Sequence, residues 1–461
     1  MVPPTIFVQI ASYRDPELVP TIQDLVQRAQ FPQRLRIVVS WQHGPEETLG
    51  IFFLQGFLRW QLHPATPFCL HTFDYGGARV ELIDIPHERS QGACWARNMI
   101  QQRYGDETYT LQLDSHHRFV AHWDTQLIDM LEQLRADGDK PLLTAYLPPY
   151  SPVAPHPETQ GAAPPLGMRF DRFIPEGPIF FRAFELPDWA ELKKPVPARF
   201  YSGHFTFADG SFAREVQHDP DYFFHGEEIS LAVRAFTHGY DLYHPHRSLA
   251  WHEYTREGRP KIWDDHDSQA RDTGQVPEAW WERNERSLAR NRALFGMNSA
   301  PSCADSSPET THDGNYGFGA ARTLSDYESY AGISFQLRAV QPEVIACRPP
   351  GLNTEPCDTD TWRSTLRRSH DLNITAHSSI MDVQSCPLAT HCRVSALRED
   401  ASIIYEETLD IDTARASCTG EWFNRRLIFF SDLTEHPAAY RLTILGPNDE
   451  VLHQFEQTIL G

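Results

Sequence analysis

Three absences narrow the kinds of protein that this chain of 461 residues can be. No stretch reaches the roughly 18 consecutive apolar residues that a membrane-spanning helix needs, so we expect no membrane span. Basic residues are scarce: 41 Lys and Arg stand against 62 Asp and Glu, and the formal charge of -21 argues against a nucleic-acid polymer as a partner. No C-x-x-C pair occurs, so the sequence does not support a cysteine-based zinc site.

The amino terminus, MVPPTIFVQIASYRDP, has neither a basic segment nor a long apolar run and does not resemble a targeting signal. Three of the eight cysteines lie before residue 304, and five lie between Cys347 and Cys418. Reduced thiols in a cytoplasmic protein are the simplest interpretation. A disulfide among the last five cysteines remains an open alternative.

The first half of the chain alternates strand and helix patterns. Hydrophobic residues make up 41% of the chain, enough for a sizeable core. Short apolar runs predict buried strands, and apolar residues at helical spacing predict helices between them. We expect strands over 5–12, 35–41, 78–85, 109–114 and 141–148, and helices over 18–29, 92–105 and 122–135. The alternation predicts an α/β fold with a mostly parallel sheet, in which ligands bind at the carboxyl ends of the strands.

The middle of the chain holds two segments of functional interest. Small and aromatic residues mix over 200–212, which indicates a turn or a close approach of the backbone to a ligand, with Gly203 as the candidate. A helix is predicted from about residue 227, with Gly239 at its carboxyl end. Glu227 and Glu228 fall in its first turn, where the helix dipole stabilises carboxylates, and that placement alone is a sufficient explanation for them.

The sequence pattern changes beyond about residue 333, where short apolar runs alternate with turn residues. This pattern predicts a small β-rich domain, with a β-sandwich as the expected form. We therefore expect two domains, residues 1–335 and 336–461. The runs are EVIACRP, LNITAHSS, CRVSAL, RLIFFSDL and YRLTILG.

The segment LQLDSHHRFV, residues 111–120, places polar side chains directly after a predicted strand. Asp114 and His116 are spaced i, i+2, which puts both on one face of an extended chain. A carboxylate and a neutral imidazole can share a divalent ion such as Mn²⁺ or Mg²⁺. His252, after another strand-like run, is a candidate third ligand. A D-x-H triplet alone is weak support, and a polar loop is the plain alternative.

Five segments taken in order resemble the GlcNAc-transferase family, glycosyltransferase family 60, of which the hydroxyproline GlcNAc-transferase acting on Skp1 is a member. Together they span about residues 5–335, and the D-S-H triplet is also similar to that of the polypeptide GalNAc-transferases. The resemblance implies a GT-A fold, a Rossmann-like nucleotide-sugar transferase domain, for this part of the chain. The segments are IFVQIASYRDPELVPTI, WARNMIQQRYGDETYTLQLDSHHRFVAHWD, FFHGEEISLAVRAFTHGYDLYHP, WHEYTR and YGFGAARTLSDYESYAGISF.

The resemblance also implies roles for individual residues. Asp114 and His116 match the metal-binding D-x-D equivalent, and His252 matches the late histidine of the metal site. Glu227 and Glu228 match the segment on the acceptor and donor-sugar side, where we expect them to be catalytic. The residues expected to bind the nucleotide sugar are Ser12, Tyr13, Arg14, Asp15, Arg97, Asp114, Ser115 and Gly203.

Structural alternatives exist for several of these residues. Arg14 and Asp15 could form a local ion pair, and Arg97 could be an exposed charge on its helix. Arg118 could anchor phosphate or take part in an ion pair. The remaining candidates are expected to be structural: His117, His225, His238, Trp123 and Trp251.

The expected function is metal-dependent transfer of N-acetylglucosamine from UDP-GlcNAc, with retention, to a hydroxyl of a protein or glycan acceptor. The carboxyl-terminal region could bind acceptor, glycan or a partner, or stabilise a homodimer. Two alternatives remain. A metal-dependent hydrolase would cleave the nucleotide sugar without an acceptor, and a non-catalytic carbohydrate-binding protein would bind without turnover.

Overall fold

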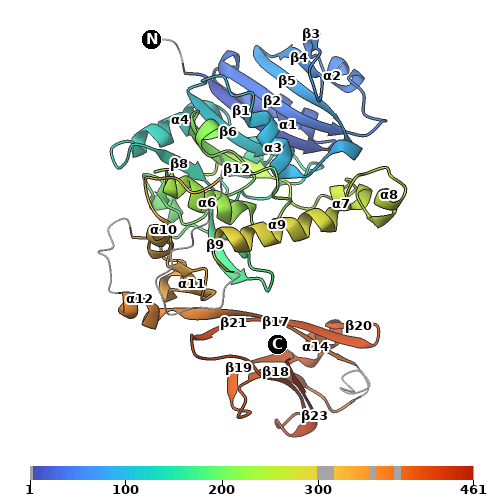
Figure 1. Ribbon diagram of the computed structural model, residues 1–461, viewed down its shortest axis with the longest axis vertical. Coiled ribbons are helices and arrows are strands. Elements are labelled where there is room, and N and C mark those ends of the chain that lie inside the picture. Colours follow the sequence, from blue (N-terminus) through green and yellow to red (C-terminus); the bar gives the residue numbers. More distant parts are fainter. Residues whose placement is uncertain (1–3, 298–315, 352–358, 378–385, 460–461) are drawn as a thin grey trace. The chain divides into compact units, whose positions relative to one another are not determined.

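The computed structural model describes residues 4–297, 316–351, 359–377 and 386–459, which form two compact units (Figure 1). The larger unit comprises the described parts of residues 1–170, 176–331 and 347–354. It is built on a ten-stranded mixed sheet. In spatial order the strands are β11 (Val196–Pro197), β13 (Asp241–His244), β8 (Pro141–Thr144), β12 (Phe205–Asp209), β6 (Tyr109–Asp114), β1 (Ile6–Tyr13), β2 (Leu35–His43), β5 (Ala78–Pro86), β4 (Leu70–Tyr75) and β3 (Leu58–His63).

The centre of this sheet is parallel, as the alternation of strands and helices predicted. β1 pairs in parallel with β2 and β6, and β2 pairs in parallel with β5. The carboxyl ends of these strands therefore meet at one edge, where ligands bind in sheets of this kind. Ala11 is opposite Asp114 in the register, so the residues that follow Ala11 extend past the end of β6.

Helices cover both faces of the sheet because successive side chains of a strand point to opposite sides. Ile6, Val8 and Ile10 of β1 share a core cluster with apolar residues of α1 (Leu18–Arg28) and α4 (Trp123–Leu134). Phe7 belongs to a second cluster with Ile100 of α3 (Ala93–Gln101). The helices predicted over 18–29, 92–105 and 122–135 are confirmed, with bounds a few residues shorter.

Two features of the sheet differ from the expected pattern. β3 and β4 add an antiparallel hairpin at one edge that the sequence analysis did not predict. β12 lies antiparallel between β6 and β8, in a segment for which a turn or a ligand contact was predicted. Because β12 runs opposite to β6, its first residues lie beside the carboxyl end of β6, and Gly203 and His204 come just before them.

Several helices of the larger unit follow β12 in the sequence. The predicted helix at residue 227 is α6 (Glu227–Thr237), and Gly239 after it has a positive φ of 89°. The polar segment that begins at residue 262 is helical in part. Its helices are α7 (Ile262–Asp265), α8 (Ser268–Asp272) and α9 (Trp280–Leu294).

The smaller unit comprises residues 171–175, 332–346 and the described part of 355–461. Two antiparallel sheets share one apolar core, which has the β-rich, sandwich-like character that the sequence predicted. One sheet holds β15 (Ile333–Ser334), β16 (Ala339–Val340), β17 (Arg367–His377), β21 (Trp422–Asp432) and β20 (Cys418–Thr419). The other holds β19 (Ile403–Asp410), β18 (His391–Leu397), β22 (Ala439–Leu445) and β23 (Val451–Thr458).

One expected strand of this region is wrong. EVIACRP falls on α11 (Pro342–Ile345), a short helix with proline at its first position, where the missing N–H costs nothing. The exact division at residue 335 stays a prediction. Cys386 and Cys392 form no disulfide. Among the described helices, none is both long and apolar enough to cross a membrane.

Candidate active site

Asp114, His116 and His252 lie together, and one ligand atom from each falls within 4.8 Å of the others. His252 Nε2 is 3.4 Å from Oδ2 of Asp114, and His116 Nε2 is 3.8 Å from the same oxygen. The two imidazole rings are 4.7 Å apart. Both histidines are buried, while the Asp114 side chain is 18% exposed.

Strand pairing explains how residues so distant in sequence meet. Asp114 is the last residue of β6, and the chain continues into the short strand β7 (His117–Phe119). β7 pairs antiparallel with β14 (Ala250–His252), and His252 is opposite His117 in that register. His252 therefore belongs to a two-stranded sheet that lies at the carboxyl edge of the large sheet.

The chemistry of these side chains fits a divalent cation. The carboxylate of Asp15 can only accept hydrogen bonds, so His116 donates to it from Nδ1 over 2.7 Å, and the lone pair of His116 lies on Nε2. Nε2 of His116 is buried and has no hydrogen-bond partner among the described residues. A buried, unpaired acceptor directed toward a carboxylate oxygen and a second imidazole is a suitable arrangement for a metal ligand.

The ionisation states agree with that arrangement. Burial opposes the charge of Asp114, but the hydrogen bond with His252 and the charge of Arg97 hold the pKa of Asp114 well below its usual value. Burial lowers the pKa of His252 to about 4. At neutral pH Asp114 is therefore a carboxylate and His252 a neutral imidazole, which are the forms that bind metals.

Arg97 is buried between two carboxylates, so the alternative of an exposed helix charge is wrong. Nη2 donates to Oδ1 of Asp114 over 2.6 Å, and Nη1 contacts Oε1 of Glu227. Burial opposes the charge of Glu227, but Arg97 and a hydrogen bond from His218 over 3.0 Å lower the pKa of Glu227 to about 2. Arg97 thus joins the end of β6 to the first turn of α6.

Glu228 differs from its neighbour. Its carboxylate accepts hydrogen bonds from the Gly203 N–H and the Tyr146 hydroxyl, both over 2.9 Å, and no arginine contact to it is recorded among the described residues. Burial raises the pKa of Glu228 to about 7. Two adjacent glutamates therefore differ in charge state, which is the pattern expected where one is structural and the other faces a ligand.

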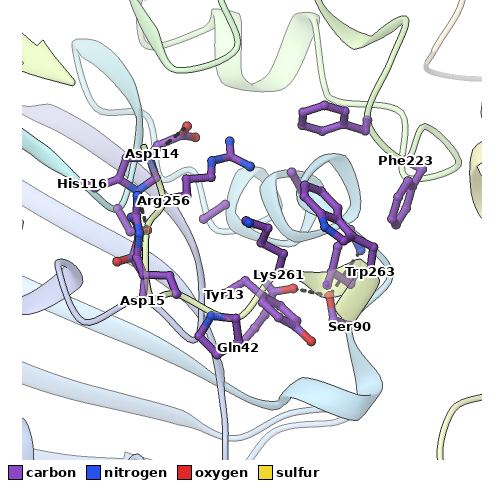
Figure 2. A pocket seen from close by; sticks show the side chains of 18 residues that line it. Tyr13, Asp15, Gln42, Ser90, Asp114, His116, Phe223, Arg256, Lys261 and Trp263 are labelled. Atoms are coloured by element: carbon purple, nitrogen blue, oxygen red, sulfur yellow. Dashed lines mark hydrogen bonds and ion pairs between the residues drawn. The ribbon is translucent and has the colours of Figure 1, made fainter. Parts of the chain in front are cut away.

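Two cavities meet at this group, and both are lined by Ala93, Asp114, Phe224 and Arg256. The first contains residues from the ends of β1 and β2, and Figure 2 shows the side chains of Arg256 and Lys261 extending into it. Its further lining residues include Tyr13, Asp15, Gln42, Ser90, Ser115, His116 and Trp263.

The second cavity is the larger, with a volume of about 350 Å³ against about 140 Å³ for the first. Its polar side is formed by the two glutamates, Arg97 and His252. Its apolar side is aromatic and includes residues of β10 (Ile179–Glu185), which follows β9 (Leu166–Phe173). The aromatic and apolar lining residues are Ile179, Phe180, Phe181, Phe224, His225 and Tyr254.

Only part of the predicted nucleotide-binding segment at the end of β1 lines the first cavity. Tyr13 and Asp15 line the first cavity. Arg14 instead contacts Glu46 and Asp265, over 2.6 Å and 3.0 Å, rather than forming the local pair with Asp15 that was considered. Ser12 is buried at the end of the strand. Gly203 lines the second cavity.

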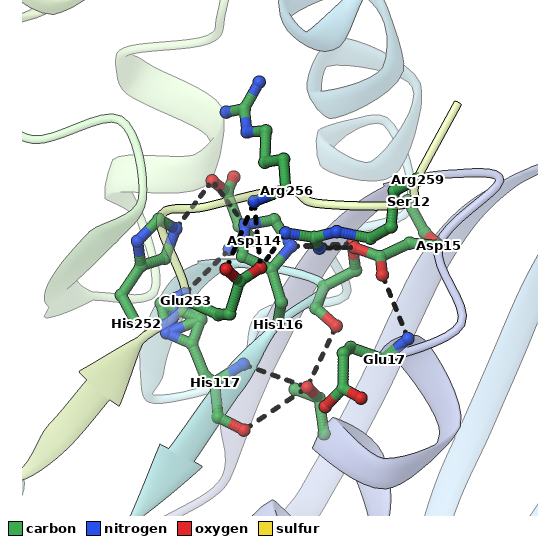
Figure 3. A network of polar contacts seen from close by, with 12 residues as sticks. Ser12, Asp15, Glu17, Asp114, His116, His117, His252, Glu253, Arg256 and Arg259 are labelled. Carbon is green, nitrogen blue, oxygen red and sulfur yellow. Dashed lines mark hydrogen bonds and ion pairs between the residues drawn. The ribbon is translucent and has the colours of Figure 1, made fainter. Parts of the chain in front are cut away.

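Of the residues expected to be structural, His225 lines the second cavity, whereas others have structural surroundings. His117 is fully buried beneath the metal-binding group, 4.9 Å from the His252 ring (Figure 3). Arg118 forms an ion pair with Glu17 over 2.6 Å. Trp123 and Trp251 are buried, as expected.

Sequence reasoning missed several residues of the site. His204 stacks on His252 with the rings 4.3 Å apart, and Tyr146 stacks on His204 at 5.1 Å. Neither belongs to a recognisable motif, because each reaches the site through the packing of β8 and β12. Arg256, Lys261 and Trp263 follow His252 closely in the sequence and line the first cavity. Arg256 ends the segment WHEYTR, whereas proximity to His252 was the only indication for Lys261 and Trp263.

One comparison with known proteins identifies the family. A family model described as Glycosyltransferase (GlcNAc) matches residues 5–55 and 54–337, well over half of the chain. No curated protein matches the sequence. A crystal structure of GalNAc-T7 with UDP, GalNAc and Mn²⁺ is 11% identical with a TM-score of 0.43, over 99% of this chain and 72% of that one. S. aureus TarS 1-349 is 9% identical with a TM-score of 0.34, over 64% and 73%. The chain has the predicted α/β fold and belongs to the GlcNAc glycosyltransferase family.

Proposed function

We propose that this glycosyltransferase moves N-acetylglucosamine from UDP-GlcNAc to an acceptor hydroxyl, with Mn²⁺ or Mg²⁺ bound by Asp114, His116 and His252. The observation that carries the proposal is the position of this group where two cavities meet. A bound divalent cation would act there as a Lewis acid toward the departing diphosphate.

The first cavity suits the nucleotide. Tyr13, Gln42 and Ser90 offer aromatic and hydrogen-bonding surfaces at the ends of the strands. Arg256 and Lys261 supply positive charge between that region and Asp114, where a diphosphate would lie (Figure 2). Gly92 and Ala93, at the amino terminus of α3, also line the cavity, and a helix amino terminus favours anions.

The second cavity suits the donor sugar and the acceptor. Glu228 can accept hydrogen bonds from sugar or acceptor hydroxyls, whereas Glu227 is engaged by Arg97 and His218. The aromatic wall offers flat apolar faces to the C–H face of a ring, and the acidic side disfavours anionic acceptors. An uncharged acceptor ring, from a glycan or a protein side chain, fits this lining best.

We carry retention over from the family resemblance. In that mechanism the acceptor hydroxyl attacks the anomeric carbon on the face from which the phosphate departs, and a phosphate oxygen takes its proton. Glu228 then orients the reactants by hydrogen bonding and forms no covalent bond. A double displacement with a glutamate as nucleophile is the alternative, and it predicts a trapped glycosyl-enzyme intermediate.

The proposal is tested by incubating the purified protein with Mn²⁺ and a panel of UDP-sugars, and by measuring UDP release with and without EDTA. We expect release that is greatest for UDP-GlcNAc, is lost in EDTA and increases when an acceptor is added. Release that no saccharide or peptide acceptor increases would favour the hydrolase. Binding of UDP-sugars without release under any condition would favour the carbohydrate-binding protein.

A further inference from the structure

Asp15, at the end of β1, contacts the metal-binding group and not only the nucleotide cavity. Oδ2 of Asp15 accepts hydrogen bonds from His116 Nδ1 over 2.7 Å, from Ser115 Oγ over 2.6 Å and from Arg259 Nη1 over 2.8 Å. Oδ1 accepts the Glu17 N–H over 2.9 Å. Figure 3 shows these contacts converging on the one carboxylate.

This carboxylate has little capacity left for a ligand. A carboxylate offers roughly four acceptor positions, two on each oxygen. Three donors already crowd Oδ2 and one occupies Oδ1. The Asp15 side chain is only 5% exposed. A ribose or uracil group therefore has no acceptor position left on Oδ2 and at most one on Oδ1, although the residue borders the first cavity.

Arg259 extends the contact to the second histidine. Its Nη1 binds Asp15, and its Nη2 contacts Oε2 of Glu253, the residue that follows His252. The backbone N–H of Glu253 also donates to the carbonyl of His116 over 3.2 Å. Asp15, Arg259 and Glu253 therefore form a buried bridge that holds both histidines, one through its ring and the other through its neighbour in the chain.

We propose that Asp15 is a positioning residue for the metal site, which holds His116 with Nε2 available as a ligand, and that it is not a nucleotide-binding residue. A carboxylate that accepts the second ring N–H of a metal-binding histidine sets the tautomer and orientation of the ring. The inference rests on the proposed function, because it assigns the second shell of the same metal site.

The test measures the Mn²⁺ concentration that gives half-maximal UDP binding, and separately the affinity for UDP in EDTA. Loss of such a partner weakens metal affinity by about 10–100-fold. We expect Asp15→Ala to raise the half-saturating Mn²⁺ concentration by that factor and to leave UDP affinity in EDTA within about twofold of wild type. Asp15→Asn, which keeps an acceptor oxygen, should show a smaller rise.

Glu46→Gln is the matched control. It removes one exposed carboxylate, the ion-pair partner of Arg14, which precedes Asp15 in the chain, and that carboxylate contacts no histidine of the metal-binding group. It should leave the Mn²⁺ requirement unchanged. Asp15→Ala removes a partner of buried Arg259 and risks misfolding, so Arg259→Lys gives a second test. We expect a rise in the Mn²⁺ requirement because the single ammonium of lysine does not reproduce the planar, two-armed guanidinium that contacts both carboxylates.

Two outcomes would overturn the inference. One is a Mn²⁺ requirement of the Asp15 variants equal to that of Glu46→Gln. The other is a loss of UDP affinity in EDTA with the Mn²⁺ requirement intact, which would make Asp15 a nucleotide ligand. Both presuppose that the wild-type protein needs Mn²⁺ for UDP binding. A wild type without that requirement would contradict the proposed function itself.

Discussion

Arg97 donates from Nη2 to Oδ1 of Asp114 over 2.6 Å, and this contact leaves Oδ2 facing His252 and His116. The second nitrogen of the same guanidinium contacts Glu227. One buried arginine therefore pairs with two carboxylates and sets which oxygen of Asp114 is directed toward the histidines. The folding of the site and the chemistry of the site therefore both depend on Arg97.

Replacing Arg97 with methionine should destabilise the protein. Two buried carboxylates would lose their common partner, and breaking a buried ion pair by removing one member costs about 3–5 kcal/mol. We expect the free energy of unfolding, measured by denaturant titration, to fall by that amount. Arg214→Met, which breaks an exposed pair with Asp106, should cost about 1 kcal/mol or less. Equal effects of the two variants would mean that Arg97 is not a structural counter-ion.

Substitution of Glu228 should affect turnover more than folding. A hydrogen bond to a charged group contributes about 1.5–3 kcal/mol, which corresponds to a loss of about 10–100-fold in the rate of UDP release for Glu228→Gln if that bond forms in the transition state. Glu227→Gln, in contrast, weakens the contact with Arg97 and should lower the melting temperature as well. A wild-type rate for Glu228→Gln would remove Glu228 from the reaction.

The same residue predicts a pH dependence of stability. Burial raises the pKa of Glu228 to about 7 in the folded protein, above its ordinary value of 4.5. Below pH 4.5 the carboxyl is neutral in both states. As the pH rises from 4.5 through 7, the unfolded state ionises before the folded one, so this group lowers the free energy of unfolding. The total loss is about 3 kcal/mol above pH 8. We therefore expect the free energy of unfolding of Glu228→Gln, relative to that of the wild type, to increase between pH 4.5 and about 7. Denaturant titration at several pH values measures it.

Glu132→Gln provides a control of opposite sign. The pKa of Glu132 is lowered, against the effect of burial, by hydrogen bonds from Arg135 and Tyr109. Its ionised form therefore stabilises the protein, and Glu132→Gln should lose stability relative to wild type as the pH rises toward 4.5, with no further change above that value. A pH-independent difference between Glu228→Gln and wild type would show that Glu228 has an ordinary pKa.

Gly92 should not tolerate a side chain. It has a φ of 110°, and an added Cβ would lie 2.9 Å from a ring carbon of Phe223, which lines the first cavity. Gly92→Ala should cost about 1–3 kcal/mol of stability and weaken UDP binding measured by calorimetry. Gly274→Ala, also at positive φ but with no atom within 4 Å, separates backbone strain from the clash and should leave UDP affinity unchanged.

Much of the parallel sheet could be predicted because buried strands and amphipathic helices leave a local pattern. Asp114 and His116 could be grouped from their spacing alone, since they are two residues apart at a strand end. His252 was a candidate third ligand because it follows a strand-like run, and the family resemblance supported that choice. His252 lies beside Asp114 because β7 pairs with β14. These two strands have three residues each and are too short to show a hydrophobic period.

Other parts of the site depend on tertiary packing that no local pattern records. His204 reaches His252 because β12 inserts antiparallel between two strands far from it in sequence. The difference between Glu227 and Glu228 arises from partners more than 80 residues away, Arg97 and Tyr146. The sequence places both glutamates in one helical turn and cannot distinguish them.

The central claim is that nucleotide binding requires a cation held by Asp114, His116 and His252. Calorimetric titration of UDP in Mn²⁺ and in EDTA, for the wild type and for His252→Ala, tests it most directly. We predict that EDTA lowers the affinity of the wild type for UDP at least tenfold, and that His252→Ala binds UDP weakly with or without Mn²⁺. Equal affinity of the wild type in Mn²⁺ and in EDTA would contradict the account.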